Sequence, residues 1–272
     1  MNVDRLLRLD GRVVVLTGAA GLLGREYAKA LVEAGASVAL VDIDAAGLER
    51  TAGELAGGGR VLTAVTDVSD ATAVSRMMAA VMGEFGRVDV LVNNAAIDPK
   101  VAPGAPAGTS LRFEDFPMVL WQQALSVNVT GMFLCAQAAA RPMLAQKGGI
   151  IINVSSIYGM LGPDQRLYES PDRAAVFVKP VTYSVTKSAV FGLTKYLSTY
   201  FSGQGIRVNT LTLGGVQHEQ DESFVQRYSQ RTPMGRMARK DEYCGALLFL
   251  ASDASSYMTG TNLVVDGGWS AW

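Results

Sequence analysis

The alternation of short apolar runs with longer helical patterns is the feature of this sequence that most constrains its fold. The runs are nearly continuous in β-branched and other apolar residues, which is typical of parallel strands buried on both faces. Because helical patterns separate them, the chain predicts an α/β fold, a doubly wound parallel sheet of about seven strands flanked by helices. The expected strands are 12–17, 37–42, 60–65, 88–93, 149–155, 206–212 and 262–266. The expected helices lie near 22–35, 45–56, 70–86, 114–146, 182–203 and 239–252.

A single domain spanning 1–272 is the organisation that we expect. Of the 272 residues, 49% are hydrophobic and 18% charged, which suits a well-buried core, and no repeat or linker interrupts the pattern. Three segments near 96–117, 160–181 and 214–235 exceed ordinary loop length. Each follows a strand, and ligands of open α/β sheets bind beyond the carboxyl ends of the strands. We therefore expect these insertions to form a substrate wall at that edge.

The charge balance argues against several classes of partner. The chain has 24 basic and 25 acidic residues, a net charge of −1, so it carries no electrostatic footprint for nucleic acid or an anionic membrane. No run of about 18 apolar residues is present, so no membrane span is expected. Charged residues between Asp4 and Arg12 break the apolar region that a signal peptide needs. Because Cys135 and Cys244 form no metal-type pair, we expect reduced thiols, no metal site and a cytoplasmic location.

Three glycines follow the first expected strand, in the stretch LTGAAGLLGRE. Gly18, Gly21 and Gly24 have the spacing G-x-x-G-x-x-G, whereas the familiar dinucleotide fingerprint is G-x-G-x-x-G. A glycine turn between a strand and a helix can hold a pyrophosphate on backbone N–H groups. Alone, the motif is equally consistent with a tight turn that binds nothing.

The end of the second strand supports the dinucleotide interpretation. Asp42 lies about 20 residues beyond Gly24, where a carboxylate binds the adenosine ribose. A carboxylate accepts hydrogen bonds from both ribose hydroxyls and repels a 2′-phosphate. Since neither Ile43 nor Asp44 supplies a cation for such a phosphate, we expect NAD rather than NADP.

Tyr183 and Lys187 are the candidate chemical pair. They lie four residues apart at the start of an expected helix and therefore on one face of it. A neighbouring ammonium stabilises a phenolate and lowers the tyrosine pKa from about 10, which would make Tyr183 an acid/base near neutral pH. The alternative is an ordinary polar contact on an exposed helix face, because Y-x-x-x-K is common by chance.

Further motifs accompany this pair along the whole chain. They are TGAAGLLG (17–24), DV (67–68), NNAA (93–96), VNVTG (127–131), INVSSIYG (152–159), YSVTK (183–187), IRVN (206–209) and TGTNLVVDGG (259–268). In this order they resemble the short-chain dehydrogenase/reductase family in its compact form, with a Rossmann-type fold. The resemblance implies that Tyr183 donates or accepts the proton and that Lys187 lowers its pKa and holds the nicotinamide ribose. It also implies that Ser156 hydrogen-bonds the substrate oxygen and that Asn128 supports a water linking Lys187 to solvent.

Two of these roles have simpler alternatives. Ser156 is preferred over Ser155 because the family places a glycine three residues after the serine, and Gly159 fits that position. Both serines could instead only satisfy the strand end, and Asn128 could only kink its helix.

The resemblance also implies the cofactor contacts. Asp67 and Val68 would flank the adenine, while Asn94, Ala95 and Ala96 would line the adenosine ribose. The remaining residues implied to bind NAD are Gly18, Gly21, Leu22, Leu23, Gly24, Asp42, Ile43, Tyr183, Lys187, Gly214 and Val216.

The chain departs from the family pattern in its first turn. The family usually has glycine where this chain has Leu22, and Gly21 precedes it instead. We expect Gly21 to supply the permissive backbone or close approach, with the Leu22 side chain turned from the phosphates.

Other departures concern the substrate side. Leu213 replaces the family's proline after the sixth strand, and the separation between Ser156 and Tyr183 is about twice the usual one. The extra segment has polar side chains that suit a hydroxyl-rich ligand, among them Tyr168, Glu169, Asp172 and Arg173. The candidate substrate contacts are Tyr158, Tyr168 and His218, although a lone histidine is more often structural or exposed.

The leading hypothesis is an NAD-dependent oxidoreductase that interconverts a secondary alcohol and a ketone. A weaker resemblance to a subgroup of bacterial surface-sugar pathways, including flagellin-glycan precursors, favours a sugar or other hydroxyl-rich substrate. One alternative is an NAD-retaining sugar epimerase or dehydratase, motivated by the Gly21 spacing and opposed by the chain length. A non-catalytic dinucleotide-binding protein is the other, opposed by the intact set of Asn128, Ser156, Tyr183 and Lys187.

The family resemblance further implies a homotetramer, or a homodimer. The expected contacts are the helices near 114–146 and 182–203 and the C-terminal strand. Trp269 and Trp272 could mark an interface or pack back on their own subunit.

Overall fold

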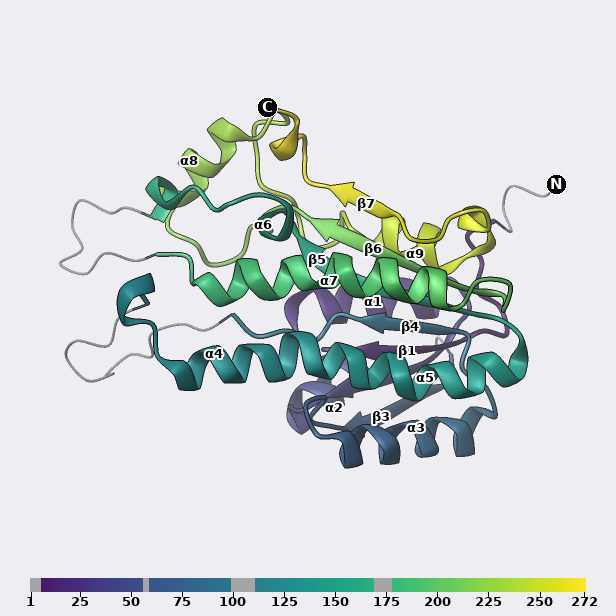
Figure 1. Cartoon of the computed structure of the whole chain (residues 1–272). Coiled ribbons are helices and arrows are strands. Elements are labelled where there is room, and N and C mark those ends of the chain that lie inside the picture. Colours follow the sequence, from purple (N-terminus) through teal and green to yellow (C-terminus); the bar gives the residue numbers. More distant parts are fainter. Residues whose placement is uncertain (1–5, 56–58, 99–110, 169–177) are drawn as a thin grey trace.

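Seven parallel strands form one sheet in the computed structural model of the chain, which describes residues 6–55, 59–98, 111–168 and 178–272 (Figure 1). The strand order is β3-β2-β1-β4-β5-β6-β7. The chain therefore winds outward from β1 in both directions, as a doubly wound fold does. The strands are β1 (Val13–Thr17), β2 (Ser37–Asp42), β3 (Val61–Val65), β4 (Val90–Asn93), β5 (Gly149–Ser156), β6 (Ile206–Leu213) and β7 (Asn262–Val265). The expected α/β sheet is confirmed, with each strand within two residues of its expected bounds.

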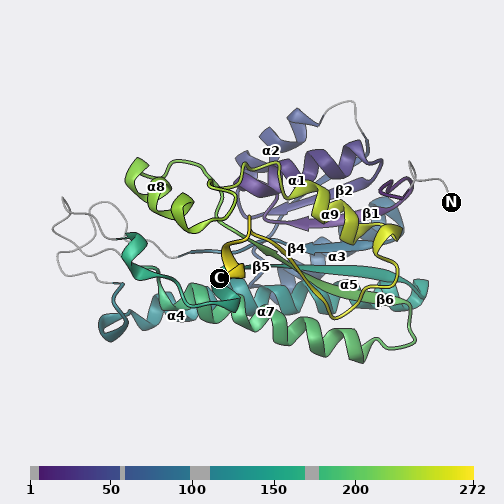
Figure 2. The ribbon, with the colours of Figure 1, turned by 90° about the horizontal axis from the view of Figure 1, so that it is seen from above.

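Helices cover both faces of the sheet, and Figure 2 shows the two layers. Successive side chains of a strand point to opposite faces. Val14 and Leu16 of β1 thus pack on one helical layer, and Val13 and Val15 on the other. The first layer contains α1 (Leu22–Glu33), α2 (Ala45–Glu54) and α9 (Cys244–Ala251). The second contains α3 (Ala71–Phe85), α5 (Met132–Gln146) and α7 (Val181–Tyr200).

The helix expected near 114–146 is interrupted by a π-helical turn. It consists of α4 (Met118–Leu125), the π turn η3 (Ser126–Gly131) and α5. By length and composition, Met118–Gln146 is the one candidate membrane span among the described residues. That is weak evidence, since the core helix of a globular protein passes the same test. Here Cys135, Ala139 and Met143 of α5 are buried against the sheet.

The described parts of the three long insertions lie beyond the carboxyl ends of the strands (Figure 1). The third is not an irregular loop as its length implied, because Glu222–Arg231 forms α8. Phe224 and Tyr228 lie four residues apart on one face of α8 and pack into a small apolar cluster. The remaining short helices are η2 (Phe113–Asp115), α6 (Ile157–Met160), η4 (Gln165–Tyr168), η5 (Asp253–Ser255) and η6 (Trp269–Ala271).

A chain of buried polar side chains crosses the middle of the fold. Asn93 of β4 donates to Asn153 of β5 at 2.9 Å. Asn153 in turn donates to Thr194 Oγ1 of α7 at 2.9 Å, and the Thr210 hydroxyl of β6 donates to the same oxygen at 2.8 Å. Most buried polar groups in folded proteins are hydrogen-bonded, because a buried group without a partner is unfavourable. This buried polar chain therefore fixes the alignment of three strands and one helix.

Candidate functional site

A cavity of about 810 Å³ lies at the carboxyl ends of β1, β2 and β4. This is where the strand order reverses, the position at which doubly wound sheets bind their ligands. Twelve residues expected to hold the adenosine half and the pyrophosphate of a dinucleotide line it: Gly18, Gly21, Leu22, Leu23, Gly24, Asp42, Ile43, Asp67, Val68, Asn94, Ala95 and Ala96.

The glycine turn at its floor differs from our expectation for Gly21. Gly18 has the left-handed backbone conformation, with φ of +68°, and a Cβ on it would lie 2.8 Å from Ala95 Cα. A Cβ on Gly24 would lie 2.0 Å from the Gly18 carbonyl oxygen. Gly21 has an ordinary extended backbone, with φ of −72°, and would be only moderately crowded by a Cβ. The permissive backbone therefore lies at Gly18 and the tightest approach at Gly24. Of the two alternatives expected for Gly21, the permissive backbone is wrong, whereas a close approach is found, because a Cβ there would lie 3.3 Å from the Gly18 carbonyl oxygen.

The start of α1 fits an anionic group. Gly21 is its N-cap residue and offers no side chain to cap the helix. The first N–H groups of a helix have no partner within it, and the helix dipole favours negative charge there. A pyrophosphate would satisfy both conditions.

Two polar side chains brace this turn. Asp42, at the end of β2, accepts hydrogen bonds from the backbone N–H groups of Ala20 at 3.0 Å and Asp44 at 3.1 Å. Asn94 donates to the carbonyl oxygens of Thr17 and Gly18 at 3.0 and 3.1 Å. The carboxylate and the central strand are thereby held against the glycine turn.

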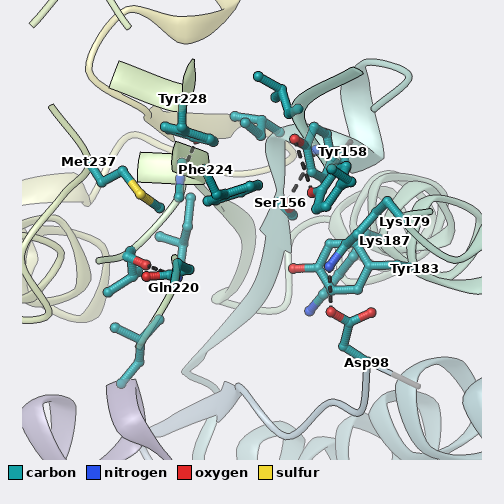
Figure 3. A pocket seen from close by; sticks show the side chains of 18 of the residues that line it. Asp98, Ser156, Tyr158, Lys179, Tyr183, Lys187, Gln220, Phe224, Tyr228 and Met237 are labelled. Carbon is teal, nitrogen blue, oxygen red and sulfur yellow. Dashed lines mark hydrogen bonds and ion pairs between the residues drawn. The ribbon is translucent and has the colours of Figure 1, made fainter. Parts of the chain in front are cut away.

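A second cavity, of about 590 Å³, adjoins the first, since Leu23 and Asn94 line both. Figure 3 shows its side chains. The expected residues that line it are Ser156, Tyr158, Tyr168, Tyr183, Lys187, Gly214 and Val216. The structure thus brings the candidate chemical groups together next to the candidate cofactor cavity.

The two serines at the end of β5 have different surroundings. The Ser155 hydroxyl donates to the Lys187 carbonyl at 2.8 Å and so ties β5 to α7. Ser156 Oγ accepts from the Tyr158 N–H at 3.2 Å, and its side chain lies near Tyr183 (Figure 3). A Cβ on Gly159 would lie 2.6 Å from the Lys187 carbonyl oxygen, so only glycine lets α6 approach α7 this closely.

Burial controls the protonation of Tyr183 and Lys187. It raises the pKa of Tyr183 to about 12, although the hydrogen bond with Ser156 acts in the opposite direction. It lowers the pKa of Lys187 to about 8, and Lys187 Nζ donates to the Val154 carbonyl at 3.1 Å. The expected lowering of the Tyr183 pKa is therefore not found in this structure. The physical reason is that desolvation outweighs the attraction of an ammonium 6.0 Å from the ring centroid.

Replacing Lys187 by Met is expected to stabilise the fold near neutral pH by about 2 kcal/mol. Each pKa unit corresponds to about 1.4 kcal/mol, so the lowered Lys187 pKa represents a penalty of about 3 kcal/mol. The variant also loses the hydrogen bond to the Val154 carbonyl, which reduces this gain in stability by about 1 kcal/mol.

The sign of the pH dependence tests this prediction. Below pH 8, Lys187 is charged in both the folded and the unfolded protein, and the penalty is complete. As pH rises from the folded pKa of about 8 to the usual value of 10.5, the folded lysine becomes neutral first and the penalty disappears. Urea unfolding across this range should show the advantage of the variant shrinking. Lys195→Met, exposed on the same helix, should show no such trend.

Asn128 occupies the π turn and holds two segments together. Its Nδ2 donates to the Ile97 carbonyl at 2.8 Å and to Thr186 Oγ1 at 3.1 Å, and its Oδ1 accepts from the Ile97 N–H at 2.8 Å. Asn128 thus connects the segment after β4 to α7. A π turn opens the regular helical pattern and is common at functional sites, which is compatible with the expected water-supporting role.

Two tyrosines hold the backbone that follows β6, on the other side of the second cavity. The Tyr228 hydroxyl of α8 accepts from the Gly215 N–H at 2.6 Å, and the Tyr243 hydroxyl donates to the Gly214 carbonyl at 3.0 Å. Tyr228 also stacks on Trp269 at 4.1 Å between ring centroids. Trp269 is 3% exposed and packs within its own chain, so it is not available for an interface.

The structure separates the candidate substrate contacts. Tyr158 and Tyr168 line the cavity, and the Tyr168 hydroxyl donates to that of Tyr158 at 3.3 Å. His218 lies outside the cavity lining, exposed beside Glu219 at 3.6 Å, so the expected contact is not found. The remaining polar residues of the insertion, Glu169, Asp172 and Arg173, lie outside the described residues.

Several lining residues were not anticipated from the sequence. Lys179 lies four residues before Tyr183, a spacing that could have indicated that the two side chains lie on the same side of the chain. Phe224 and Tyr228 have helical spacing that could have indicated α8. Asp98 and Met237 carry no local signal. These five residues all line the second cavity.

Comparison with known proteins identifies the family. The family model described as enoyl-(acyl carrier protein) reductase matches residues 18–270. D-threitol dehydrogenase of Mycolicibacterium smegmatis is 36% identical over 276 residues, which cover 99% of this chain and 97% of the relative. Galactitol 2-dehydrogenase (L-tagatose-forming) of Cereibacter sphaeroides is 36% identical over 278 residues and covers both chains completely.

A solved structure shares the whole fold. The gluconate 5-dehydrogenase of Burkholderia cenocepacia, in complex with NADP and tartrate, is 32% identical, covers 100% of both chains and has a TM-score of 0.84. Together with the sequence relatives and the family model, it shows that this chain belongs to the short-chain dehydrogenase/reductase family of oxidoreductases.

Proposed function

We propose that the protein is an NAD-dependent dehydrogenase that interconverts a secondary alcohol and a ketone on a sugar, polyol or other hydroxyl-rich small molecule. The observation that carries the proposal is the meeting of Ser156, Tyr183 and Lys187 in one cavity next to the cavity at the glycine turn. The names of the relatives, a threitol and a galactitol dehydrogenase, support a polyhydroxylated substrate.

The residues at the glycine turn fit a dinucleotide. An uncapped helix start would receive its pyrophosphate, and Asp42 would accept the ribose hydroxyls. Gly214 and Val216 line the second cavity, where the nicotinamide end would lie. When bound, NAD would supply the acceptor or donor of the hydride.

The protein's own groups would manage the proton and the substrate oxygen. With a raised pKa, Tyr183 is a neutral phenol at pH 7 and can donate a proton at its Oη to a carbonyl oxygen. Ser156, beside it, would hydrogen-bond the same oxygen and fix its position. Lys187 lies on the same helix face and would hold the cofactor ribose, while Asn128 keeps the supporting segments in place.

The direct test is NADH formation, followed by its absorbance, with a panel of threitol, galactitol, gluconate and simple secondary alcohols. We expect turnover with hydroxyl-rich substrates. Turnover of a sugar nucleotide without net NADH formation, with NAD retained through purification, would instead indicate an epimerase or dehydratase. Lack of any turnover, together with tight NAD binding, would favour a non-catalytic protein.

The cofactor preference should depend on Asp42. The gluconate 5-dehydrogenase structure contains NADP, so the choice of NAD rests on this side chain. Asp42→Asn should raise KM for NAD about 10-fold, because a charge-assisted hydrogen bond to a ribose hydroxyl contributes about 1.5–3 kcal/mol. It should also improve the use of NADP, since the repulsion of a 2′-phosphate is removed.

A matched control distinguishes this effect from the loss of one negative charge elsewhere on the protein. Asp253→Asn removes the same charge from a side chain that is 77% exposed and does not line the cavity, and should leave the ratio of NAD to NADP efficiency unchanged. An unchanged ratio in Asp42→Asn would contradict the assignment.

We also propose that the protein acts in the cytoplasm as a homotetramer, or a homodimer. Apolar side chains are exposed on the helices expected to form the interface, namely Met118, Val119, Phe133, Val185, Tyr196 and Tyr200. Exposed apolar surface of this kind marks association sites. Light scattering should give the mass of two or four chains, and a monomeric mass would exclude the proposal.

A further inference from the structure

An ion pair lies against the ring of Tyr183 and has no part in the function proposed so far. Lys179 Nζ contacts Asp98 Oδ2 and lies 3.9 Å from the centroid of the Tyr183 ring (Figure 3). The side chains of Lys179 and Asp98 are 13% and 30% exposed, so both are largely withdrawn from water. Both line the second cavity.

Two separate segments build this pair. Asp98 follows β4, and Lys179 precedes α7 at the end of the insertion between Ser156 and Tyr183. The backbone of Lys179 is held by Gln165, whose Oε1 accepts from the Lys179 N–H at 2.8 Å and whose Nε2 donates to its carbonyl at 3.3 Å. The backbone of Lys179 is therefore fixed beside the ring, and the contact with Asp98 holds its ammonium over the ring.

Stability alone does not account for this arrangement. Asp98 Oδ1 is buried and has no hydrogen-bond partner among the described residues. A buried carboxylate oxygen without a partner is unfavourable, and a buried ion pair contributes little net stability. The pair is better explained by its position beside the reacting phenol.

We propose that the Lys179–Asp98 ion pair sets the electrostatic potential at the Tyr183 hydroxyl and so adjusts the acid strength of Tyr183, an inference that rests on the proposed function. Lys179 acts through the face of the ring, because a cation over an aromatic ring is attracted by its electrons and stabilises a phenolate more strongly than a phenol. Asp98 partly cancels that cation. Removing the Lys179 ammonium should therefore make Tyr183 a weaker acid, and removing the Asp98 carboxylate should make it a stronger one.

The other titratable groups around Tyr183 come from three elements and from the segment before α9. Lys187 lies on α7, Tyr158 on α6, Tyr168 on η4, and Tyr243 just before α9. Asp98 raises the pKa of Tyr183, and for Lys187 the two partners oppose each other, with Asp98 raising the pKa and Lys179 lowering it. The ion pair thus acts on both members of the candidate chemical pair.

The kinetic test compares Asp98→Asn, Lys179→Met and the double variant. The pH profile of kcat/KM reports the ionisation of the free enzyme. At a fixed pH on the acidic limb of alcohol oxidation, we expect kcat/KM to rise about 10-fold in Asp98→Asn and to fall about 10-fold in Lys179→Met. The double variant should return close to the wild-type profile, and Lys179→Arg should retain it.

A matched surface pair supplies the control. Arg60 and Glu84 form an exposed ion pair at 2.7 Å on the far side of the fold from the cavity lining. Arg60→Met and Glu84→Gln make the same charge changes and should leave the pH profile unchanged. Thermal unfolding of every variant identifies any that fold poorly.

A second readout needs no substrate. In protein labelled with isotopic tyrosine, the nuclear magnetic resonance signal missing from Tyr183→Phe identifies Tyr183. Its ionised fraction at a fixed alkaline pH should be largest in Asp98→Asn and smallest in Lys179→Met. If no substrate is ever turned over, the proposed function fails while this titration still decides the inference. Shifts in the same direction, or none, would overturn it.

Discussion

Replacing Tyr183 by Phe should reduce kcat by about 10³-fold and weaken NAD binding by a much smaller factor. The variant loses only the hydroxyl that would exchange a proton with the substrate, and positioned acid/base groups contribute about 10²–10⁴-fold. The ring itself remains. Its edge-to-face contact with Tyr158, at 6.5 Å, and its contact with the Lys179 ammonium do not require the hydroxyl.

The measurement is steady-state turnover with the best substrate of the panel, together with NADH binding by fluorescence. Tyr257→Phe is the matched control, because Tyr257 is fully exposed and does not line the cavity. It should keep wild-type kcat. If Tyr183→Phe kept more than about a tenth of wild-type kcat, Tyr183 would not be the proton donor or acceptor.

Gly24→Ala should have the second large effect, on both stability and cofactor binding. The added Cβ would lie 2.0 Å from the Gly18 carbonyl oxygen and 2.8 Å from Ala19 Cα, distances at which the backbone must move. Overpacking of this kind typically costs about 1–3 kcal/mol, and a backbone contact is hard to relieve, so we expect about 3 kcal/mol. Because the displaced backbone is the cofactor turn, we expect NAD affinity to fall by at least about 10-fold.

Urea unfolding and a direct NAD binding titration measure the two effects. Gly83→Ala is the control for a glycine-to-alanine change within a helix. A Cβ on Gly83 meets nothing within 4 Å, and alanine favours the helix, so the variant should be neutral or slightly more stable. The losses of stability and NAD affinity in Gly21→Ala should be intermediate between those of Gly24→Ala and Gly83→Ala, because its Cβ would be 3.3 Å from the Gly18 carbonyl oxygen. A stable Gly24→Ala protein with unchanged NAD affinity would contradict the geometry.

The elements that could be predicted from sequence are those whose burial is visible in their own pattern of apolar and polar residues. Strands such as β5 are buried on both faces and are therefore continuously apolar, and the helices between them have clear periodicity. The turn at Gly18 to Gly24, Asp42, and the Tyr183–Lys187 pair are local patterns, so the structure could place them where they were expected.

What could not be predicted depends on groups that are distant in the sequence. The direction of the Tyr183 pKa shift comes from burial by the cavity wall, which no local spacing reveals. The crowding of Gly24 is caused by a carbonyl in the preceding turn, and that of Gly18 by Ala95 of another strand end. The Lys179–Asp98 pair joins two insertions, and the exposure of His218 depends on how its loop folds.

The buried polar chain from Asn93 through Asn153 and Thr194 to Thr210 has a consequence for how new specificities could arise. It anchors the strand ends and the helix that carry Ser156, Tyr183 and Lys187 in the interior of the sheet. Much of the wall that would meet the rest of a substrate, including η4 and α8, packs outside the sheet. Substitutions in that wall can therefore reshape the cavity without realigning the reacting groups, so a chain of this design can acquire a different alcohol as substrate while its chemistry stays the same.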